Sequence, residues 1–290
     1  MIIDFHTHTF PQKISARVVD SLSKKALIHP YTDGSLDALL SSMEEAGVDY
    51  SVNLPVMTDI NQVDKLNTGF IESMERLTQR GIIPFGGLHP DYEDYDKELR
   101  RLKKAGIAGI KLHPAYQGID LDDIRTLRIL EAASREGLIV IIHAGVDIGI
   151  YDHNYSSVDQ VITVLKEVAP DKLVLAHFGN WGCWDQVESD LAGAPVWFDT
   201  AFSLGPIIPR SEKEGNPAWT SNLSDEDFLR IARKHGTDRI LFATDSPWAS
   251  QKDYIDKLKQ LELSSDEKEA IFFDNAKKLL ASAGWNGSKN

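Results

Sequence analysis

Short apolar runs rich in β-branched residues recur along the chain, and each is followed by a segment with helical periodicity. Parallel strands that are buried on both faces have such near-continuous apolar sequences. We therefore predict eight strands, at residues 2–6, 50–54, 82–87, 107–112, 138–143, 173–177, 196–199 and 240–243.

Predicted helices occupy the segments between these strands, at residues 36–46, 62–79, 92–104, 122–135, 158–168, 185–191, 225–234 and 254–261, with a final helix at 266–280. Glycines such as Gly47 and Gly137 follow several of them, where a left-handed residue usually ends a helix. Eight strand–helix units predict a single-domain α/β fold, a distorted (β/α)8 TIM barrel over residues 1–290. An open doubly wound sheet is the structural alternative, but the sequence has no glycine-rich nucleotide fingerprint to support it.

Two segments are longer than a minimal barrel needs. One is an insertion after the first strand, at residues 12–33, and the other is a long loop after the seventh strand, at residues 200–223. Both follow strand ends, so both lie on the C-terminal face, where such barrels carry their chemistry. We expect them to act as lids or specificity elements.

Composition narrows the classes of partner. The net charge of -13 argues against binding to nucleic acid or to anionic membranes, which requires clustered Lys and Arg. Cys183 is the single cysteine, which excludes a disulfide framework within one chain and suits a reducing cytoplasm. No apolar run approaches the 18 or so residues that span a bilayer, so we expect a soluble, cytoplasmic protein. Tryptophan-containing loops are compatible with a homodimer.

Candidate metal ligands end the predicted strands. His6 and His8 share a face of the first strand, because residues i and i+2 of a strand point to the same side. A His-x-His pair alone is more often satisfied by hydrogen bonds or solvent, so the prediction depends on the other strands. Six of the nine histidines lie at or just past strand ends: His6, His8, His89, His113, His143 and His177. Asp245 follows the eighth strand, and the barrel should bring all of these side chains to one mouth.

His6-x-His8, Lys111, His143, His177 and Asp245 together resemble the amidohydrolase superfamily of metal-dependent hydrolases. The runs Lys111-Leu112-His113-Pro114, His177-Phe178-Gly179 and Thr244-Asp245-Ser246-Pro247-Trp248 resemble, more narrowly, the amidohydrolase-related branch that includes aminocarboxymuconate-semialdehyde decarboxylase and the resorcylate-type decarboxylases. This resemblance implies that His6, His8, His143 and Asp245 hold one divalent metal, usually zinc, with manganese or iron as alternatives. It also implies that His177 contacts the substrate, acts as acid or base, or binds a second metal.

Lys111 has two interpretations. Binuclear members of the superfamily bridge their metals with a carboxylated lysine at this position, so a second metal with carboxylated Lys111 is one of them. The other is an unmodified ammonium group that pairs with a substrate carboxylate.

The predicted function is hydrolysis of an amide, ester or lactone in a small organic substrate. A divalent metal acidifies its bound water, and Asp245 would accept the proton of that water and later protonate the leaving group. The first alternative is a nonoxidative decarboxylase of a small aromatic or unsaturated carboxylic acid. The second alternative is a catalytically inactive metal-binding barrel.

Four further residues are candidates for substrate binding. His89 and His113 lie in Leu-His-Pro runs, where each either lines the pocket or caps a turn. Trp248 either contacts an apolar substrate or seals the barrel mouth. Arg210 either holds a substrate anion or is a solvated surface residue.

Overall fold

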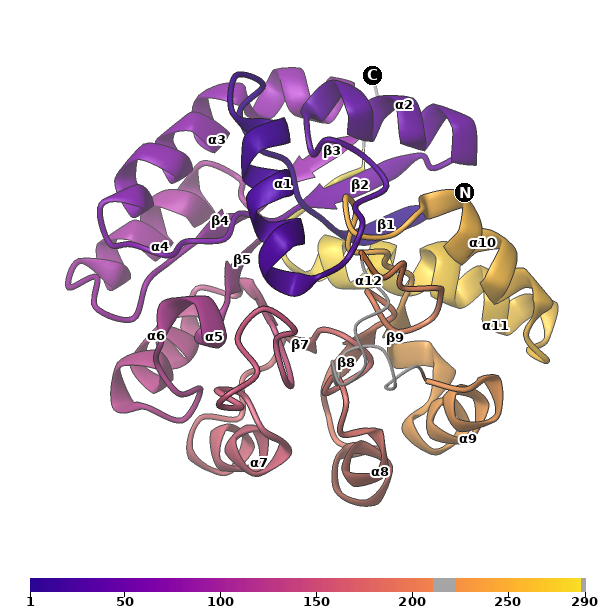
Figure 1. The fold of residues 1–290 in the computed structure, drawn as a ribbon. Coiled ribbons are helices and arrows are strands. Elements are labelled where there is room, and N and C mark those ends of the chain that lie inside the picture. Colours follow the sequence, from indigo (N-terminus) through magenta and orange to yellow (C-terminus); the bar gives the residue numbers. More distant parts are fainter. Residues whose placement is uncertain (211–222, 288–290) are drawn as a thin grey trace.

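The computed structural model of the protein describes residues 1–210 and 223–287. Within these residues, short parallel strands lie at the centre and helices surround them (Figure 1). The strands are β1 (Ile3–Thr7), β2 (Tyr50–Asn53), β3 (Ile82–Pro84), β4 (Gly86–Gly87), β5 (Gly109–Leu112), β6 (Ile139–Ile142), β7 (Leu173–Leu175), β8 (Trp197–Asp199) and β9 (Ile240–Leu241).

The strands close into a barrel, as predicted. Strands β1 to β3 pair in one sheet and β4 to β9 in another, always in chain order and always parallel. Phe85 divides the predicted third strand into β3 and β4, yet its amide still donates to Asn53 at 3.0 Å. Phe5 donates to the carbonyl of Phe242 at 2.9 Å, which joins β1 to the end of β9. Closure therefore places the first strand, β1, beside the last strand, β9.

Most predicted helices are present, and several begin or end elsewhere. The helices are α1 (Ser15–Ala26), α2 (Leu36–Ala46), α3 (Gln62–Gln79), α4 (Tyr95–Lys104), α5 (Pro114–Gln117), α6 (Ile124–Arg135), α7 (Val158–Glu167), α8 (Trp184–Gln186), α9 (Asp225–His235), α10 (Gln251–Gln260), α11 (Ser265–Glu269) and α12 (Asn275–Ser282). The segment predicted as helix 185–191 is mostly the π-helix η1 (Val187–Leu191), and η4 (Ala270–Asp274) joins α11 to α12. Helix α10 starts three residues before the predicted 254 because Ser250 caps it, accepting the amide of Asp253 at 3.1 Å. None of the helices in residues 1–210 and 223–287 is long and apolar enough to cross a membrane.

The barrel interior is apolar at its N-terminal end. Ile3, Val52 and Ile141 point inward from three strands, and Leu279 and Leu280 of α12 pack against the same cluster. Helix α12 therefore closes this end, which leaves the C-terminal end for chemistry.

The two long segments meet over the C-terminal end. Helix α1 lies within the insertion at residues 12–33, where no helix was predicted, and Figure 1 shows it in front of the strands. The chain after α1 pairs with the loop after β8 through the backbone. The amide of His29 donates to the carbonyl of Ile208 at 2.7 Å, and the amide of Arg210 donates to the carbonyl of Leu27 at 2.8 Å. Residues 211–222, the remainder of the predicted loop 200–223, lie outside the described residues.

Candidate metal centre and active-site cavity

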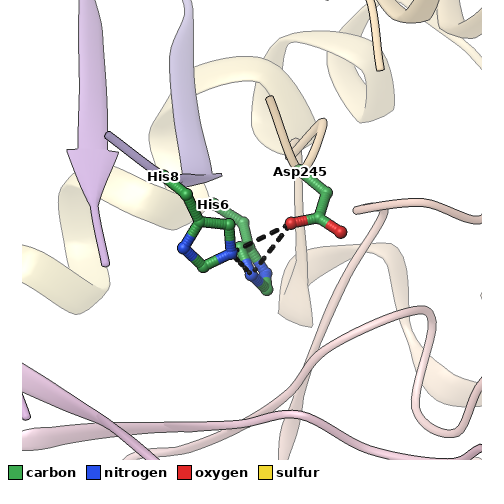
Figure 2. A group of neighbouring side chains, drawn as sticks. All are labelled: His6, His8 and Asp245. Atoms are coloured by element: carbon green, nitrogen blue, oxygen red, sulfur yellow. Dashed lines mark hydrogen bonds and ion pairs between the residues drawn. The ribbon is translucent and has the colours of Figure 1, made fainter. Parts of the chain in front are cut away.

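Three buried side chains converge at the C-terminal end of β1. The Nε2 atoms of His6 and His8 are 3.1 Å apart, and Oδ1 of Asp245 lies 3.5 Å from the first and 3.0 Å from the second (Figure 2). All three residues are buried. The structure thus brings together three of the four predicted metal ligands.

Local backbone irregularities aim these side chains. Ile3 and Phe5 point into the barrel interior, so strict alternation along β1 would send His6 outward. The pairing register of β1 with β2 shifts between Asp4 and Thr7, and such an irregularity re-aims the residues that follow it. Asp245 has a left-handed backbone with a φ of 69°, and its amide donates to the carbonyl of His6 at 2.8 Å. This direct bond fixes the carboxylate beside the histidine pair, in a conformation that costs on the order of 1–3 kcal/mol for a residue with a side chain.

Hydrogen bonds set the orientation of each histidine ring. His6 Nδ1 lies 2.9 Å from Oδ2 of Asp199, and His8 Nδ1 lies 2.8 Å from the carbonyl of Leu54. Both partners are acceptors, so each Nδ1 carries the ring hydrogen and each Nε2 presents a lone pair to the site. Histidines that bind metals are typically held in this way by a carboxylate or a carbonyl.

The donor atoms suit a divalent cation. Two imidazole lone pairs and a carboxylate oxygen face one another at 3.0–3.5 Å, an arrangement of acceptors that a cation would stabilise. Ligands about 2.1 Å from a tetrahedral zinc ion lie roughly 3.4 Å apart, which matches these separations. His6, His8 and Asp245 therefore fit a metal, and their nitrogen and oxygen donors are compatible with zinc, manganese or iron.

His143 and His177 form an adjacent pair. His177 Nδ1 lies 3.0 Å from the carbonyl of Ala201, which leaves Nε2 as an acceptor 2.9 Å from His143 Nδ1. His143 belongs to a second buried group with His113 and Asp147, in which the possible ligand atoms lie within 4.8 Å of one another. Its role as a fourth ligand stays a prediction, as does the role of His177 as acid, base or second-metal ligand.

Burial shapes the protonation of the site. It lowers the pKa of His177 to about 4, and it lowers the pKa values of His6 and His143 well below the usual 6.5. These imidazoles are therefore neutral near pH 7, the form that binds metals. Burial also raises the pKa of Asp199, while the charge of Lys111 and the amides of His177 and Ala201 oppose this rise and favour the carboxylate that accepts from His6.

Lys111 points its amine at the donor group, that is, at the possible metal ligands His6, His8 and Asp245. Its Nζ lies 3.3 Å from His6 Nε2, and the residue is 1% exposed. Burial lowers the pKa of Lys111 to about 8, against the opposing charges of Asp199, Asp245 and Asp147. Both predicted forms of Lys111, the ammonium and the carboxylated amine, are compatible with this position.

A cavity of about 710 Å³ opens above the donor group. It is lined by most of the predicted site residues, namely His6, His8, Lys111, His113, His143, His177, Asp245 and Trp248. His89 and Arg210 lie outside its described lining. His89 Nδ1 accepts the amide of Asp91 at 3.2 Å, and Arg210 pairs with Asp20 of α1 at 3.1 Å. Through this pairing, Arg210 ties α1 to the loop after β8, and its predicted role in substrate binding stays a prediction.

Two carboxylates of the site were not predicted. Asp199 ends β8 and holds His6, while Asp147 lies in the loop four residues after His143. Asp147 Oδ2 is 3.7 Å from His113 Nε2 and 3.8 Å from His143 Nε2, and burial raises its pKa to about 6. Asp199 shares the signal that identified the histidines, a polar residue at the end of an apolar strand. Asp147 has no such signal, because its loop position is defined only by the fold.

The closed barrel carries possible metal ligands at its C-terminal mouth, which defines a TIM-barrel protein with a metal-compatible site. The family model described as Amidohydrolase matches residues 3–281, and the chain belongs to this amidohydrolase family. The resemblance inferred from the sequence is therefore confirmed.

Solved structures with the same fold cover nearly the whole chain. An uncharacterised TIM-barrel protein from Bordetella bronchiseptica is 19% identical with a TM-score of 0.74, and the match covers 98% of this chain and 99% of that one. The 5-carboxyvanillate decarboxylase of Sphingomonas paucimobilis is 14% identical with a TM-score of 0.66, covering 97% and 98%. A dihydroxybenzoic acid decarboxylase from Polaromonas sp. JS666, with bound manganese and 2-nitroresorcinol, is 13% identical with a TM-score of 0.66, covering 97% and 96%. No curated protein matches the chain.

Proposed function

We propose that the protein is a metal-dependent, nonoxidative decarboxylase of a small aromatic or unsaturated carboxylic acid. The observation that carries the proposal is the amine of Lys111, buried 3.3 Å from the donor group at the base of a mostly apolar cavity. This arrangement offers cationic charge to a carboxylate in surroundings that favour neutral carbon dioxide over the charged acid. Two of the similar structures are decarboxylases by name, which supports the same choice.

Each residue then has a defined role. A divalent cation held by His6, His8 and Asp245 supplies positive charge for the oxygen atoms of the substrate. Lys111 pairs with the carboxylate. The bond between the substrate carbon and the carboxylate breaks, its electron pair stays on the carbon, and carbon dioxide leaves. That carbon takes a proton that Oδ2 of Asp245 accepts from water and passes on. The reaction needs no oxidant or reductant.

Hydrolysis of an amide, ester or lactone is the second candidate. It is favoured by the carboxylate of Asp245 beside both histidines, where it can accept a proton from a water molecule.

A cytoplasmic location, a small-molecule substrate and a homodimer are also proposals. The single free cysteine suits the cytoplasmic location.

The test is decarboxylation in deuterium oxide. The protein is loaded with zinc or manganese and incubated with a panel of hydroxybenzoates, and carbon dioxide release and deuterium incorporation are measured together. We expect one deuterium at the carbon that loses the carboxylate for each carbon dioxide released. Asp245→Asn should abolish both signals, whereas Glu98→Gln, a change at a buried carboxylate bonded to Asn67 and Arg101, should keep them. Hydrolysis of esters or lactones without any decarboxylation would contradict the proposal and favour the second candidate.

A further inference from the structure

Helix α1 buries one part of its surface and lines the cavity with another. Val19 is buried outside the cavity, whereas half-buried Ile14, Val18 and Leu22 line the cavity together with buried Ala26. Val18, Leu22 and Ala26 are spaced four apart, so they form a continuous row on one side of the helix, and Ile14 directly precedes the first turn. At 1.5 Å per residue, the row is about 12 Å long.

Apolar side chains from other elements also line the cavity. Leu66 and Phe70 come from α3, Ile148 from the loop after β6, and Phe202 from the loop after β8. Apolar surface left in contact with water has a free-energy cost of about 25 cal/mol per Å². The side chains of this wall would therefore bind an apolar group that covers them.

The size of the cavity exceeds the needs of a single ring. A cavity of about 150 Å³ accommodates benzene, whereas this one measures about 710 Å³. Lys111, His113 and Asp147 line the cavity beside the possible metal ligands, and Asn61, Gln62 and Lys65 add polar groups at the start of α3. The rest of the lining, which includes the row on α1, is mostly apolar.

We infer that the substrate carries an extended apolar substituent, an alkyl chain or a second ring, which lies along Ile14, Val18 and Leu22 while its carboxylate occupies the metal end. This inference rests on the proposed function for the identity of the head group. Helix α1, which belongs to the insertion at residues 12–33, is then a specificity element. Arg210 joins it to the loop after β8 by donating to Asp20 and Ser23, at 3.1 and 2.8 Å.

The test is equilibrium binding, which does not depend on turnover. Dissociation constants of benzoate, 4-butylbenzoate and 4-octylbenzoate for the zinc-loaded protein are measured by titration calorimetry. We expect affinity to rise by about three- to fourfold for each added methylene group while the chain contacts the wall, because each buried methylene contributes about 0.8 kcal/mol.

Variants in α1 locate the effect. Leu22→Trp should remove most of the gain of 4-octylbenzoate over benzoate, and Val18→Phe should remove part of it, with circular dichroism reporting the fold. Ser21→Trp is the matched control, since Ser21 is exposed on the same helix, and it should retain the gain. Equal affinity for the three ligands, no binding of any of them, or a gain that is unchanged in both folded cavity variants would overturn the inference. Suppose that Leu22→Trp removes the gain in affinity of 4-octylbenzoate over benzoate, but the wild-type protein decarboxylates no substrate. That result would support the apolar site and contradict only the proposed function.

Discussion

Replacement of Asp199 by asparagine is expected to weaken metal binding through His6. One carboxylate oxygen, Oδ2, lies 2.9 Å from His6 Nδ1, while Oδ1 accepts the amides of His177 at 2.9 Å and Ala201 at 3.0 Å. Asparagine has nearly the same shape, and its amide oxygen can keep the two backbone bonds. Its NH₂ group then faces His6 Nδ1, where the wild-type protein has an acceptor.

A donor at this position reverses the tautomer of His6. The ring hydrogen moves from Nδ1 to Nε2, so the lone pair that faces His8 and Asp245 is lost. Rotating the asparagine side chain by half a turn would restore an acceptor for His6 Nδ1, but its NH₂ group would then face the backbone N–H groups of His177 and Ala201. Loss of such a supporting partner typically lowers metal affinity about 10- to 100-fold, which corresponds to about 1.4–2.7 kcal/mol.

The assay is the dissociation constant for zinc at pH 7.5, by competition with a chromogenic chelator, with circular dichroism as the check on folding. Glu98→Gln is the matched control, because it also converts a buried carboxylate to an amide but bonds to Asn67 and Arg101 away from the site. The control should bind zinc within about twofold of wild type, as expected for distant sites. A folded Asp199→Asn protein with wild-type zinc affinity would refute the tautomer argument.

Three further predictions concern charge and metal. Lys111→Gln should weaken benzoate binding about 10- to 100-fold, because one charge-assisted hydrogen bond is lost. Native mass spectrometry of the wild-type protein should find Lys111 unmodified. A mass increase equal to one carbon dioxide, removed by acid, would indicate the carboxylated form instead. In the metal-free protein, burial lowers the pKa values of His177 and His235 to about 4, so only the unfolded chain protonates these histidines between pH 6.5 and 4, and each contributes a loss of about 1.4 kcal/mol of unfolding free energy per pH unit. The raised pKa values of Asp147 and Asp199 oppose this loss. His235→Gln should therefore reduce the fall of stability with pH measured by urea unfolding, and a fall as steep as that of wild type would count against it. Chelation should lower the melting temperature, because a ligand at about a thousand times its dissociation constant contributes about 4 kcal/mol; an unchanged melting temperature with the metal demonstrably removed would oppose this.

The barrel and the convergence of its strand ends were predictable from the sequence. Buried parallel strands have a strong apolar signal, and their order around a barrel follows the order along the chain. His6, His8 and Asp245 could be identified because each ends a strand, and closure between β1 and β9 places those ends together.

Other parts of the site depend on contacts that no local pattern encodes. The register shift in β1 decides which face His6 occupies, and it is visible only once β1 pairs with β2. Helix α1 lacks an N-cap side chain that bonds its first turn, so its start has no clear sequence signal. Arg210 illustrates the same limit: its pairing with Asp20 joins residues 190 positions apart, and only the tertiary fold brings them together.

The central claim is that His6, His8 and Asp245 hold a divalent metal. Its most direct test is anomalous diffraction from crystals of protein purified without chelators, with data collected on both sides of the absorption edges of zinc, manganese and iron. The account predicts one strong peak within bonding distance of His6 Nε2, His8 Nε2 and Asp245 Oδ1. No peak in metal-reconstituted crystals, or a peak only between His113, His143 and Asp147, would contradict it.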